Sequence, residues 1–238
     1  QTALAFRKDL AADKNLEQLT REGIFSDCRK ITGSKQSLTD DDFFLKELHS
    51  SEKWPAFLQT AVEKKRTIVI CGETGSGKTV LTRALLKSLH KDERVIILED
   101  VHEVTVDHVV EAVYMMYGDA GKIGRVSATD ALRACMRLTP GRIIMTELRD
   151  DAAWDYLKAL NTGHPGGVMS THANSARDAF NRIGLLIKAT PIGRMLDMSD
   201  IMRMLYSTID VVVHMEKRKI KEIYFDPEYK MQCVNGSL

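Results

Sequence analysis

The sequence predicts an α/β protein with a mostly parallel sheet that is flanked by helices and closed by a C-terminal β-hairpin. Short runs of branched apolar residues alternate along the chain with segments of helical periodicity. The first run, residues 67–72, leads directly into a glycine-rich turn and a helix. The last two runs, residues 209–215 and 220–225, alternate with charges as hairpin strands do. Successive strand–helix units place parallel strands side by side.

The composition is that of a globular chain. Of the 238 residues, 44% are hydrophobic and 28% are charged, and the net charge is +1. This balance argues against a general basic surface for nucleic acid, although a local basic patch remains compatible with it. The four cysteines are scattered without a C-x-x-C pair, which disfavours a cysteine-based zinc or redox site and fits a reducing compartment. No apolar run approaches the roughly 20 residues of a membrane span, and we expect no signal peptide.

The first fifty residues offer few core candidates. Leu16 and Leu19 predict a small helix after Asp13, and Gly23 would end it. Residues 32–42 are polar and are typical of a linker or exposed loop. A short apolar helix face is then predicted from Phe43, Phe44, Leu45 and Leu48.

A second helix is predicted over residues 55–65, because Pro55 is favoured at the first helical position. This helix leads directly into the first strand. Its core-facing residues are expected to be Phe57, Leu58, Ala61 and Val62.

The segment after the first strand is a complete phosphate-binding motif. It matches G-x-x-x-x-G-K-[ST] and lies between a strand and a helix over residues 80–90. Glycines let backbone N–H groups close around a phosphate, and the helix dipole favours the same anion. Lys78 can reach the β- and γ-phosphates, and the Thr79 hydroxyl can bind Mg²⁺. An ordinary glycine-rich turn is the alternative, which the intact motif disfavours. We expect ATP and Mg²⁺ to bind Gly72, Glu73, Thr74, Gly75, Ser76, Gly77, Lys78 and Thr79.

Two further buried strands end in acids. Residues 94–100 end in Glu99 and Asp100, and residues 142–147 end in Glu147. Carboxylates at strand ends of such a sheet lie where ligands bind. A solvated strand end is the alternative for the first pair of acids.

The other segments continue the alternation of strands and helices. Residues 109–116 are apolar and fit either a strand or a helix. Further elements are predicted as a loop at 117–125, a helix at 127–138 with Arg133 and Arg137 on one face, a helix at 151–160, a tight loop at 163–167, a strand at 168–171 followed by His172, and helices at 181–188 and 195–205.

Together these features resemble the traffic ATPases of bacterial type IV secretion systems, within the secretion and pilus ATPase superfamily. The match is carried by GETGSGKT at 72–79, IILED at 96–100, LRACMRLTPGRIIMTELRD at 132–150 and LNTGHPGGVMSTHA at 160–173. Their order and spacing are similar to the family's phosphate loop, acidic box, Walker B region and histidine box. The resemblance covers residues 54–225.

The resemblance implies a RecA-like P-loop NTPase domain over residues 54–238. Residues 1–53 would be a remnant of the family's N-terminal domain and its linker. The chain departs from the family at Thr139 and Gly141, where Arg and Asp are usual, and at Thr146, where Gly is usual.

The resemblance also implies catalytic roles. Glu99 is expected to be the catalytic residue of the acidic box, and Glu147 is expected to lie beside the metal with Thr79. The residues alone leave this division of roles open. Lys78 would neutralise phosphate charge, and His172 would sense the γ-phosphate, with a structural histidine as the alternative.

Four other residues carry weaker expectations. His164 would assist the site or only brace its glycine-rich turn. Arg133, Arg137 and Arg149 would serve subunit contacts or supply an arginine finger, with solvated surface arginines as the alternative.

The implied activity is that of a Mg²⁺-dependent, ATP-hydrolysing motor subunit of a type IV secretion or conjugation apparatus, powering substrate translocation or pilus assembly. The resemblance further implies a homo-hexamer that meets other secretion-apparatus proteins at the inner membrane. We therefore expect a cytoplasmic protein that can associate peripherally with that membrane.

Three alternatives remain open. A type II secretion or type IV pilus motor often carries a four-cysteine metal module, which this chain lacks. A nucleic-acid translocase on a RecA-like core is disfavoured by the near-neutral charge, and nucleic acid is not directly indicated. A nucleotide-binding scaffold without turnover is disfavoured by the intact motif residues and acids.

Overall fold

The computed structural model describes residues 16–24, 26, 35–118, 126–148 and 152–236. The chain divides into two compact units, Gln1–Lys35 and Gln36–Leu238. In the first unit, the predicted small helix is present as α2 (Leu16–Arg21), and Gly23 follows it with a φ of 83°. The second unit contains the sheet, and it also includes residues 36–53, which the sequence analysis assigns to the linker segment.

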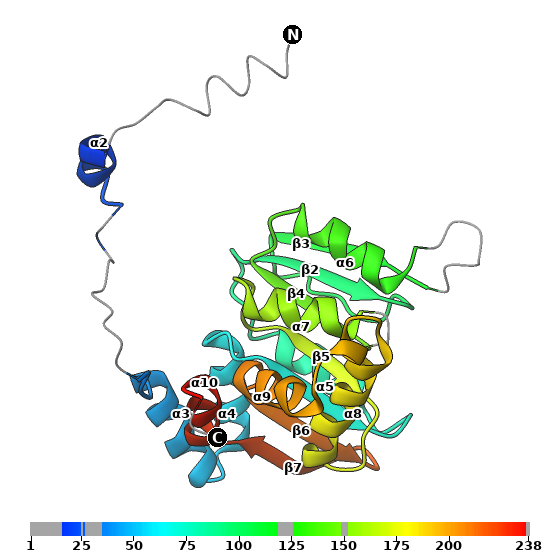
Figure 1. The fold of residues 1–238 in the computed structure, drawn as a ribbon. Coiled ribbons are helices and arrows are strands. Elements are labelled where there is room, and N and C mark those ends of the chain that lie inside the picture. The colour runs from blue at the N-terminus through cyan, green and yellow to red at the C-terminus, as the bar shows by residue number, and fades with distance from the viewer. Residues whose placement is uncertain (1–15, 25, 27–34, 119–125, 149–151, 237–238) are drawn as a thin grey trace. The chain divides into compact units, whose positions relative to one another are not determined.

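A seven-stranded sheet forms the centre of the second unit (Figure 1). The strand order is β3-β2-β4-β5-β1-β6-β7. All neighbouring strands are parallel except β6 and β7, which form the predicted antiparallel hairpin. The mostly parallel α/β fold is thus confirmed. The strands are β1 (Ile68–Gly72), β2 (Arg94–Glu99), β3 (Glu111–Met116), β4 (Arg142–Met145), β5 (Val168–Thr171), β6 (Val211–Glu216) and β7 (Lys219–Phe225).

Helices cover both faces of the sheet, and each face has its own hydrophobic core. One core includes side chains of α6 (Ala128–Met136), α7 (Ala153–Asn161), α8 (Ala176–Ala189) and α9 (Met198–Thr208). The other includes side chains of α3 (Asp40–Ser50), α4 (Trp54–Glu63) and α5 (Lys78–Leu86). The short helices η1 (Gly193–Met195) and α10 (Pro227–Val234) complete the unit.

The central strand β1 shows why its sequence is uniformly apolar. Val69 and Cys71 enter one core, while Ile68 and Ile70 enter the other, because successive side chains point to opposite faces. None of the described helices combines the length and the hydrophobicity that crossing a bilayer requires.

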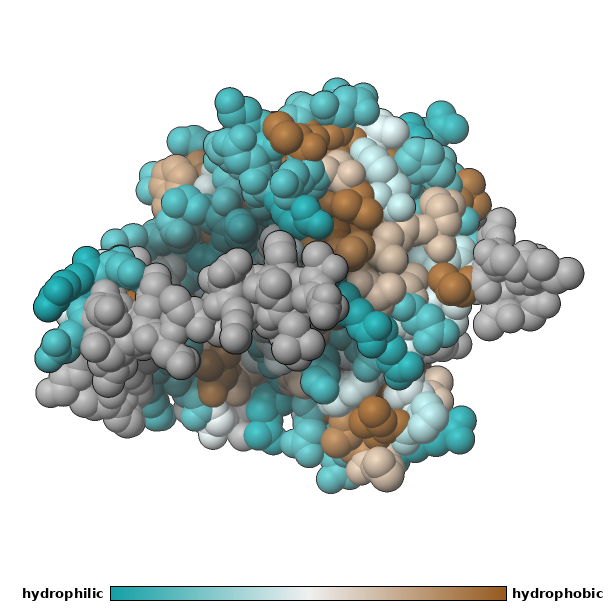
Figure 2. Space-filling model, turned by 90° about the horizontal axis from the view of Figure 1, so that it is seen from above, coloured by the Kyte–Doolittle hydropathy of each residue, from teal (hydrophilic) through white to brown (hydrophobic). Residues whose placement is uncertain are grey.

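Helix α3 differs from its predicted apolar face. Thr39 and Asp42 form a capping box that fixes the start of the helix. Leu45 and Leu48 are buried, but Phe43 and Phe44 are 58% and 50% exposed, so only part of the predicted apolar face is covered. On the face drawn in Figure 2, hydrophobic residues likewise occur in separate groups among hydrophilic ones.

Two elements needed the tertiary structure to be assigned. The apolar segment that fits a strand or a helix forms the edge strand β3, which pairs with β2 along its whole length. Helix α10 was not predicted. It nevertheless carries the usual start signals, because Pro227 opens it and the Asp226 side chain accepts a hydrogen bond from the N–H of Tyr229.

A buried arginine ties together segments at the amino ends of the strands. Arg142 is fully buried, and its guanidinium donates to both carboxylate oxygens of Glu93 at 3.0 Å. It also donates to the carbonyl oxygens of Val62 and Gly166. Burial opposes the ionisation of Glu93, but the Arg142 charge outweighs it, so the pKa of Glu93 lies below its ordinary 4.5.

We predict that Arg142→Ala lowers the free energy of unfolding by about 3 kcal/mol, because it leaves the mostly buried Glu93 carboxylate with only the more distant Lys65 as a partner. Urea titration followed by circular dichroism measures the change. The matched control is Arg94→Ala, which removes a more exposed ion pair with Glu111 and should cost less than about 1 kcal/mol. Equal losses in the two variants would contradict the role of Arg142.

The loss of unfolding free energy in Arg142→Ala should depend on pH, with a defined sign. A depressed carboxylate pKa stabilises the fold above the unfolded-state value, and this contribution is lost as the pH falls through the folded-state value. The difference between wild type and Arg142→Ala should therefore be full above about pH 5 and should shrink below pH 4.5.

Candidate functional site

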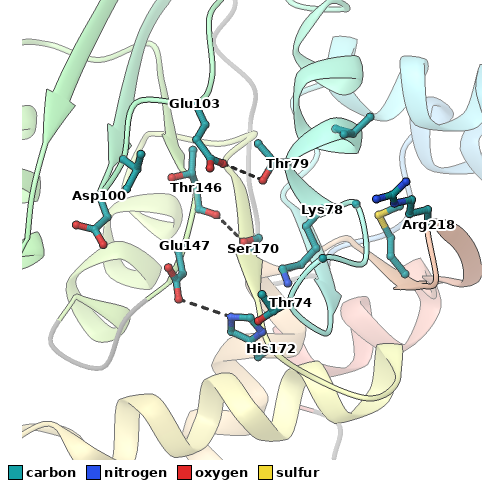
Figure 3. Close-up of a pocket in the computed structure, with 15 residues that line it drawn as sticks. Thr74, Lys78, Thr79, Asp100, Glu103, Thr146, Glu147, Ser170, His172 and Arg218 are labelled. Atoms are coloured by element: carbon teal, nitrogen blue, oxygen red, sulfur yellow. Dashed lines mark hydrogen bonds and ion pairs between the residues drawn. The ribbon is translucent and has the colours of Figure 1, made fainter.

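The candidate site lies where four neighbouring parallel strands end. β1 continues into the phosphate loop (residues 72–79) and β2 into the acidic loop (residues 100–106). A cavity of about 800 Å³ is lined by side chains from both loops and from the ends of β4 and β5 (Figure 3). The ionisable residues of its wall are Lys78, Asp100, Glu103, Glu147, His172 and Arg218. Chain folding therefore brings residues of all four predicted boxes to one cavity.

Two glycines allow the phosphate loop to take its shape. Gly77 precedes α5 with a φ of 99°, a left-handed conformation that favours glycine. A Cβ atom at Gly72 would collide with the carbonyl oxygen of Met215 on β6. The amino end of α5 begins at Lys78, and a helix of this length presents unpaired backbone N–H groups that attract an anion.

Lys78 points into the cavity from the first turn of α5. Its Nζ donates to the carbonyl oxygens of Gly72 and Glu73, at 2.8 and 2.9 Å. Partial burial lowers the pKa of Lys78, and the negative charge of Glu147 opposes that shift. The ammonium group is thus held at the mouth of the loop by weak neutral partners, which an anionic phosphate would replace.

Thr79 faces a carboxylate that the sequence analysis did not single out. The Thr79 hydroxyl donates to Glu103 Oε2 at 3.1 Å (Figure 3). Arg83, one turn further along α5, donates through Nε to the Glu103 carbonyl oxygen at 2.6 Å. The acidic loop is therefore fastened to α5 by side-chain and backbone contacts at the same residue. The available signal was a third acid, four residues after the acid that ends β2.

Glu99, expected to be the catalytic acid, is fully buried and does not line the cavity. Its Oε1 accepts the backbone N–H groups of Glu103 and Val104, at 3.3 and 3.0 Å. Its Oε2 lies 3.0 Å from Nδ1 of His102, whose ring packs edge-on against Tyr114. The carboxylate of Glu99 thus shapes the acidic loop, and Glu103 is the glutamate of this loop that reaches the cavity.

Glu147 and His172 approach each other across the cavity (Figure 3). His172 Nε2 lies 3.7 Å from Glu147 Oε1, and both side chains are partly exposed. The backbone between them is tied down, because the Ser170 hydroxyl donates to the Thr146 carbonyl and the Leu148 N–H donates to the Ser170 carbonyl. These contacts between the segment after β4 and strand β5 fix the positions of the acid and the imidazole.

His164 does not line this cavity. Its Nδ1 lies 2.8 Å from the carbonyl oxygen of Pro140, so it braces the glycine-rich turn before β5.

Cys71 is the last residue before the phosphate loop glycine, and it is a buried free cysteine whose Sγ donates to the Ser175 carbonyl. Burial raises the pKa of the Cys71 thiol to about 12, so it is a protonated core residue at neutral pH.

Arg133 and Arg137, expected to serve subunit contacts or an arginine finger, do not line the cavity. Arg133 lies on α6, where it meets Asp130 and Asp155 at 3.7 and 3.8 Å with a largely exposed side chain. Arg137 is exposed at the end of the same helix, and Arg149 lies outside the described residues. The arginine that lines the cavity is Arg218, from the turn between β6 and β7.

The donor set of the cavity fits Mg²⁺. Hydroxyl and carboxylate oxygens are available from Thr79, Glu103 and Glu147, and such oxygens are the ligands that Mg²⁺ prefers. In the described part of the chain, no group of three or more His, Cys, Asp or Glu residues could hold a metal ion alone. Mg²⁺ is commonly bound by one or two protein oxygens together with substrate phosphates, so this arrangement suits it.

Comparison with known proteins indicates the same family that the sequence motifs resemble. The profile of the family described as "Type II/IV secretion system protein" matches residues 34–222. The type IV secretion system protein VirB11 of Bartonella quintana is 34% identical, over 98% of this chain and 69% of that protein. The type IV secretion system protein PtlH of Bordetella pertussis is 36% identical, over 91% of this chain and 63% of that protein.

A solved structure agrees with the family profile and with the two relatives. The crystal structure of the VirB11 ATPase from the Brucella suis type IV secretion system, in complex with sulphate, superposes with a TM-score of 0.85 at 34% identity. The match covers 93% of this chain and 66% of that one, so this chain spans about two thirds of the length of its relatives. The chain belongs to the type II/IV secretion system protein family and, within it, to the VirB11-type ATPases of type IV secretion systems.

Proposed function

We propose that this chain is the ATP-hydrolysing motor domain of a type IV secretion or conjugation apparatus, powering substrate translocation or pilus assembly. One observation carries the proposal: a complete phosphate loop shares a cavity of about 800 Å³ with acids from two other strand ends and with His172. Phosphoryl transfer to water needs phosphate binding, charge neutralisation and an oriented water, and these residue types can supply all three.

In the proposed site, residues 72–79 bind the phosphates of ATP through backbone N–H groups. Lys78 exchanges its contacts with loop carbonyl oxygens for the β- and γ-phosphates. Mg²⁺, which would be held by the Thr79 hydroxyl with Glu147 nearby, supplies neutralisation of phosphate charge when bound. The fit of hard oxygen donors around Thr79 supports this assignment.

We assign the water-orienting carboxylate to Glu103, with Glu99 as its positioning residue. Glu99 is enclosed and its oxygens already accept hydrogen bonds, whereas Glu103 lines the cavity beside Thr79. A general base must come within hydrogen-bond reach of the proton it accepts, and this requirement favours the residue at the cavity wall. Glu99 would act through the loop that it holds.

His172 is proposed to sense the γ-phosphate. It projects from the end of β5 toward Glu147 and the tip of the Lys78 side chain (Figure 3). An imidazole in this place can donate a hydrogen bond to a phosphate oxygen and thereby link β5 to the nucleotide state.

The assembly and location are proposed from the family. We propose a homo-hexamer at the cytoplasmic base of the apparatus, in contact with other secretion-apparatus proteins at the inner membrane. The relatives VirB11 and PtlH are type IV secretion system proteins, which supports a place for this chain in such a system. A ring would let each domain pass its nucleotide-dependent movement to a neighbour.

Lys78→Ala is predicted to remove most of the ATP affinity and all measurable hydrolysis while leaving the fold intact. The partly exposed ammonium neutralises phosphate charge and contributes little to packing. Calorimetric titration with ATP and a phosphate-release assay measure both effects. The matched control is Lys87→Ala, at the other end of α5, which should behave as wild type. Unchanged hydrolysis in Lys78→Ala would overturn the proposed site.

The same variant tests the ring. Mixed with wild-type chain, it should depress activity more than dilution does, and activity per protomer should rise with concentration as light scattering reports assembly. Activity proportional to the wild-type fraction, from a monomer at every concentration, would remove the hexamer from the proposal.

Glu103→Gln is predicted to bind Mg-ATP but to hydrolyse it at least about a hundredfold more slowly, because it keeps the size of the side chain and removes the proton acceptor. Glu99→Gln should lose less activity, since the amide oxygen can still accept the backbone N–H groups of the acidic loop. Steady-state kinetics on both variants decide the assignment. A larger loss in Glu99→Gln than in Glu103→Gln would return the catalytic role to Glu99.

His172→Ala is predicted to lower kcat while leaving ADP affinity unchanged, because ADP lacks the phosphate that His172 would contact. The comparison variant His164→Ala removes a brace of the turn, so it should lower the melting temperature instead. Titrations with ADP and ATP, together with thermal unfolding, separate the two. Equal losses of ADP and ATP affinity in His172→Ala would show a structural role.

A further inference from the structure

The turn between β6 and β7 rests on the phosphate loop. Its two residues, Lys217 and Arg218, have φ values of 50° and 61°. The backbone N–H of Arg218 donates to the carbonyl oxygen of Ser76 at 3.1 Å. A Cβ atom at Gly77 would lie 3.2 Å from the Met215 methyl carbon and 3.7 Å from the Arg218 Cα. The backbone of the turn therefore contacts the phosphate loop directly, in addition to the side-chain contact.

The residue types of this turn are unexpected. A two-residue hairpin turn with two positive φ values strongly favours Asn and Gly, and other residues there cost about 1–2 kcal/mol each. Backbone strain of this kind persists where the surroundings determine it, and it gathers at functional sites. The outlier at Arg218 thus invites a functional explanation, because the residue also lines the cavity.

The side chain of Arg218 lies on one side of the loop and the acids lie on the other. In Figure 3, Glu147, His172 and Asp100 stand beyond Lys78 from Arg218. Val80, in the first turn of α5, also lines the cavity and is 69% exposed. Within the described residues, no carboxylate lies within ion-pairing distance of the Arg218 guanidinium.

The direction of a bound nucleotide follows from these positions. Lys78 reaches the β- and γ-phosphates, so the γ-phosphate lies toward the acids and His172. A nucleotide is an extended molecule, so its nucleoside leaves the loop on the other side. That side carries Arg218.

We propose that Arg218 binds the nucleoside end of ATP, with its guanidinium plane against the purine ring. This inference rests on the proposed ATP site and adds a residue that holds the base. A guanidinium is always charged, is weakly hydrated and stacks on aromatic rings, which suits an unpaired arginine at the edge of a cavity. The β6–β7 turn positions the guanidinium by its contact with Ser76.

The test compares Arg218→Ala with Lys217→Ala in calorimetric titrations of the 238-residue chain. Lys217 is the matched control, because it shares the turn and the positive φ but pairs with Glu216 and does not line the cavity. Each variant is titrated with ATP, ADP and inorganic tripolyphosphate. Arg218→Ala should bind ATP and ADP about tenfold more weakly and tripolyphosphate as wild type does. Lys217→Ala should bind all three normally.

Two further variants guard against misreading. Arg218→Lys keeps the charge but not the plane, so it should recover little of the ATP affinity. Arg218→Asn suits the left-handed turn, so a loss of ATP affinity in this variant cannot come from a broken turn.

Each contrary result has one meaning. Equal losses for tripolyphosphate and ATP would place Arg218 on the phosphates and overturn the proposal, and so would unchanged ATP affinity in Arg218→Ala. If the wild-type chain bound neither ATP nor tripolyphosphate, the proposed function itself would fail.

Discussion

The close approach of two backbones at the centre of the sheet is the constraint on which the site depends. β6 pairs with β1 up to Gly72, and the Met215 carbonyl occupies the space that a side chain at Gly72 would need. Any larger residue would push β6 away from β1. That displacement would carry the β6–β7 hairpin off the phosphate loop and open the core that both strands share. The first glycine of the motif therefore serves the packing of the sheet as well as its proposed role in binding phosphate.

A buried charge organises the second loop of the site. A carboxylate enclosed at the end of β2 is costly unless hydrogen bonds compensate it, and here two backbone N–H groups and an imidazole do so. The donors belong to the acidic loop itself, so the hydrogen bonds that compensate the buried carboxylate also fix the shape of the loop. Arg83 and Thr79 then hold the outer part of that loop against α5. Glu99 and Glu103 thus divide between them the tasks of building the loop and facing the cavity.

Much of the fold was predictable because its signals are local. The strand, glycine-rich loop and helix around Lys78 follow from residue type and spacing within a dozen positions, and the strands ending near Glu99 and Glu147 follow from apolar runs of ordinary length. Exposure of Phe43 was not predictable in this way. A helical face is buried only if another element covers it, and coverage is decided by the tertiary structure.

The candidate site was predictable to the same extent, from local signals only. Lys78, Thr79, Glu147 and His172 were found because each belongs to a motif or a strand end. Glu103 and Arg218 were not, since one lies four residues beyond its strand and the other is about 140 residues from the loop that it touches. Distances of that kind are set by the pairing of β1 with β6 and by the bonds of Glu99, which no local pattern encodes.

The cysteine that precedes the phosphate loop has a practical consequence. Oxidants and alkylating reagents attack the thiolate, and a thiol with a pKa of about 12 is almost entirely protonated at pH 7. Cys71 is also enclosed in the core on one face of the sheet, away from solvent. The candidate site thus has a sulfur atom next to its glycine-rich turn without the reactive thiolate that a redox sensor needs. We therefore expect reagents that target thiols to leave Cys71 unmodified, and we expect this residue to need no protection by a reductant.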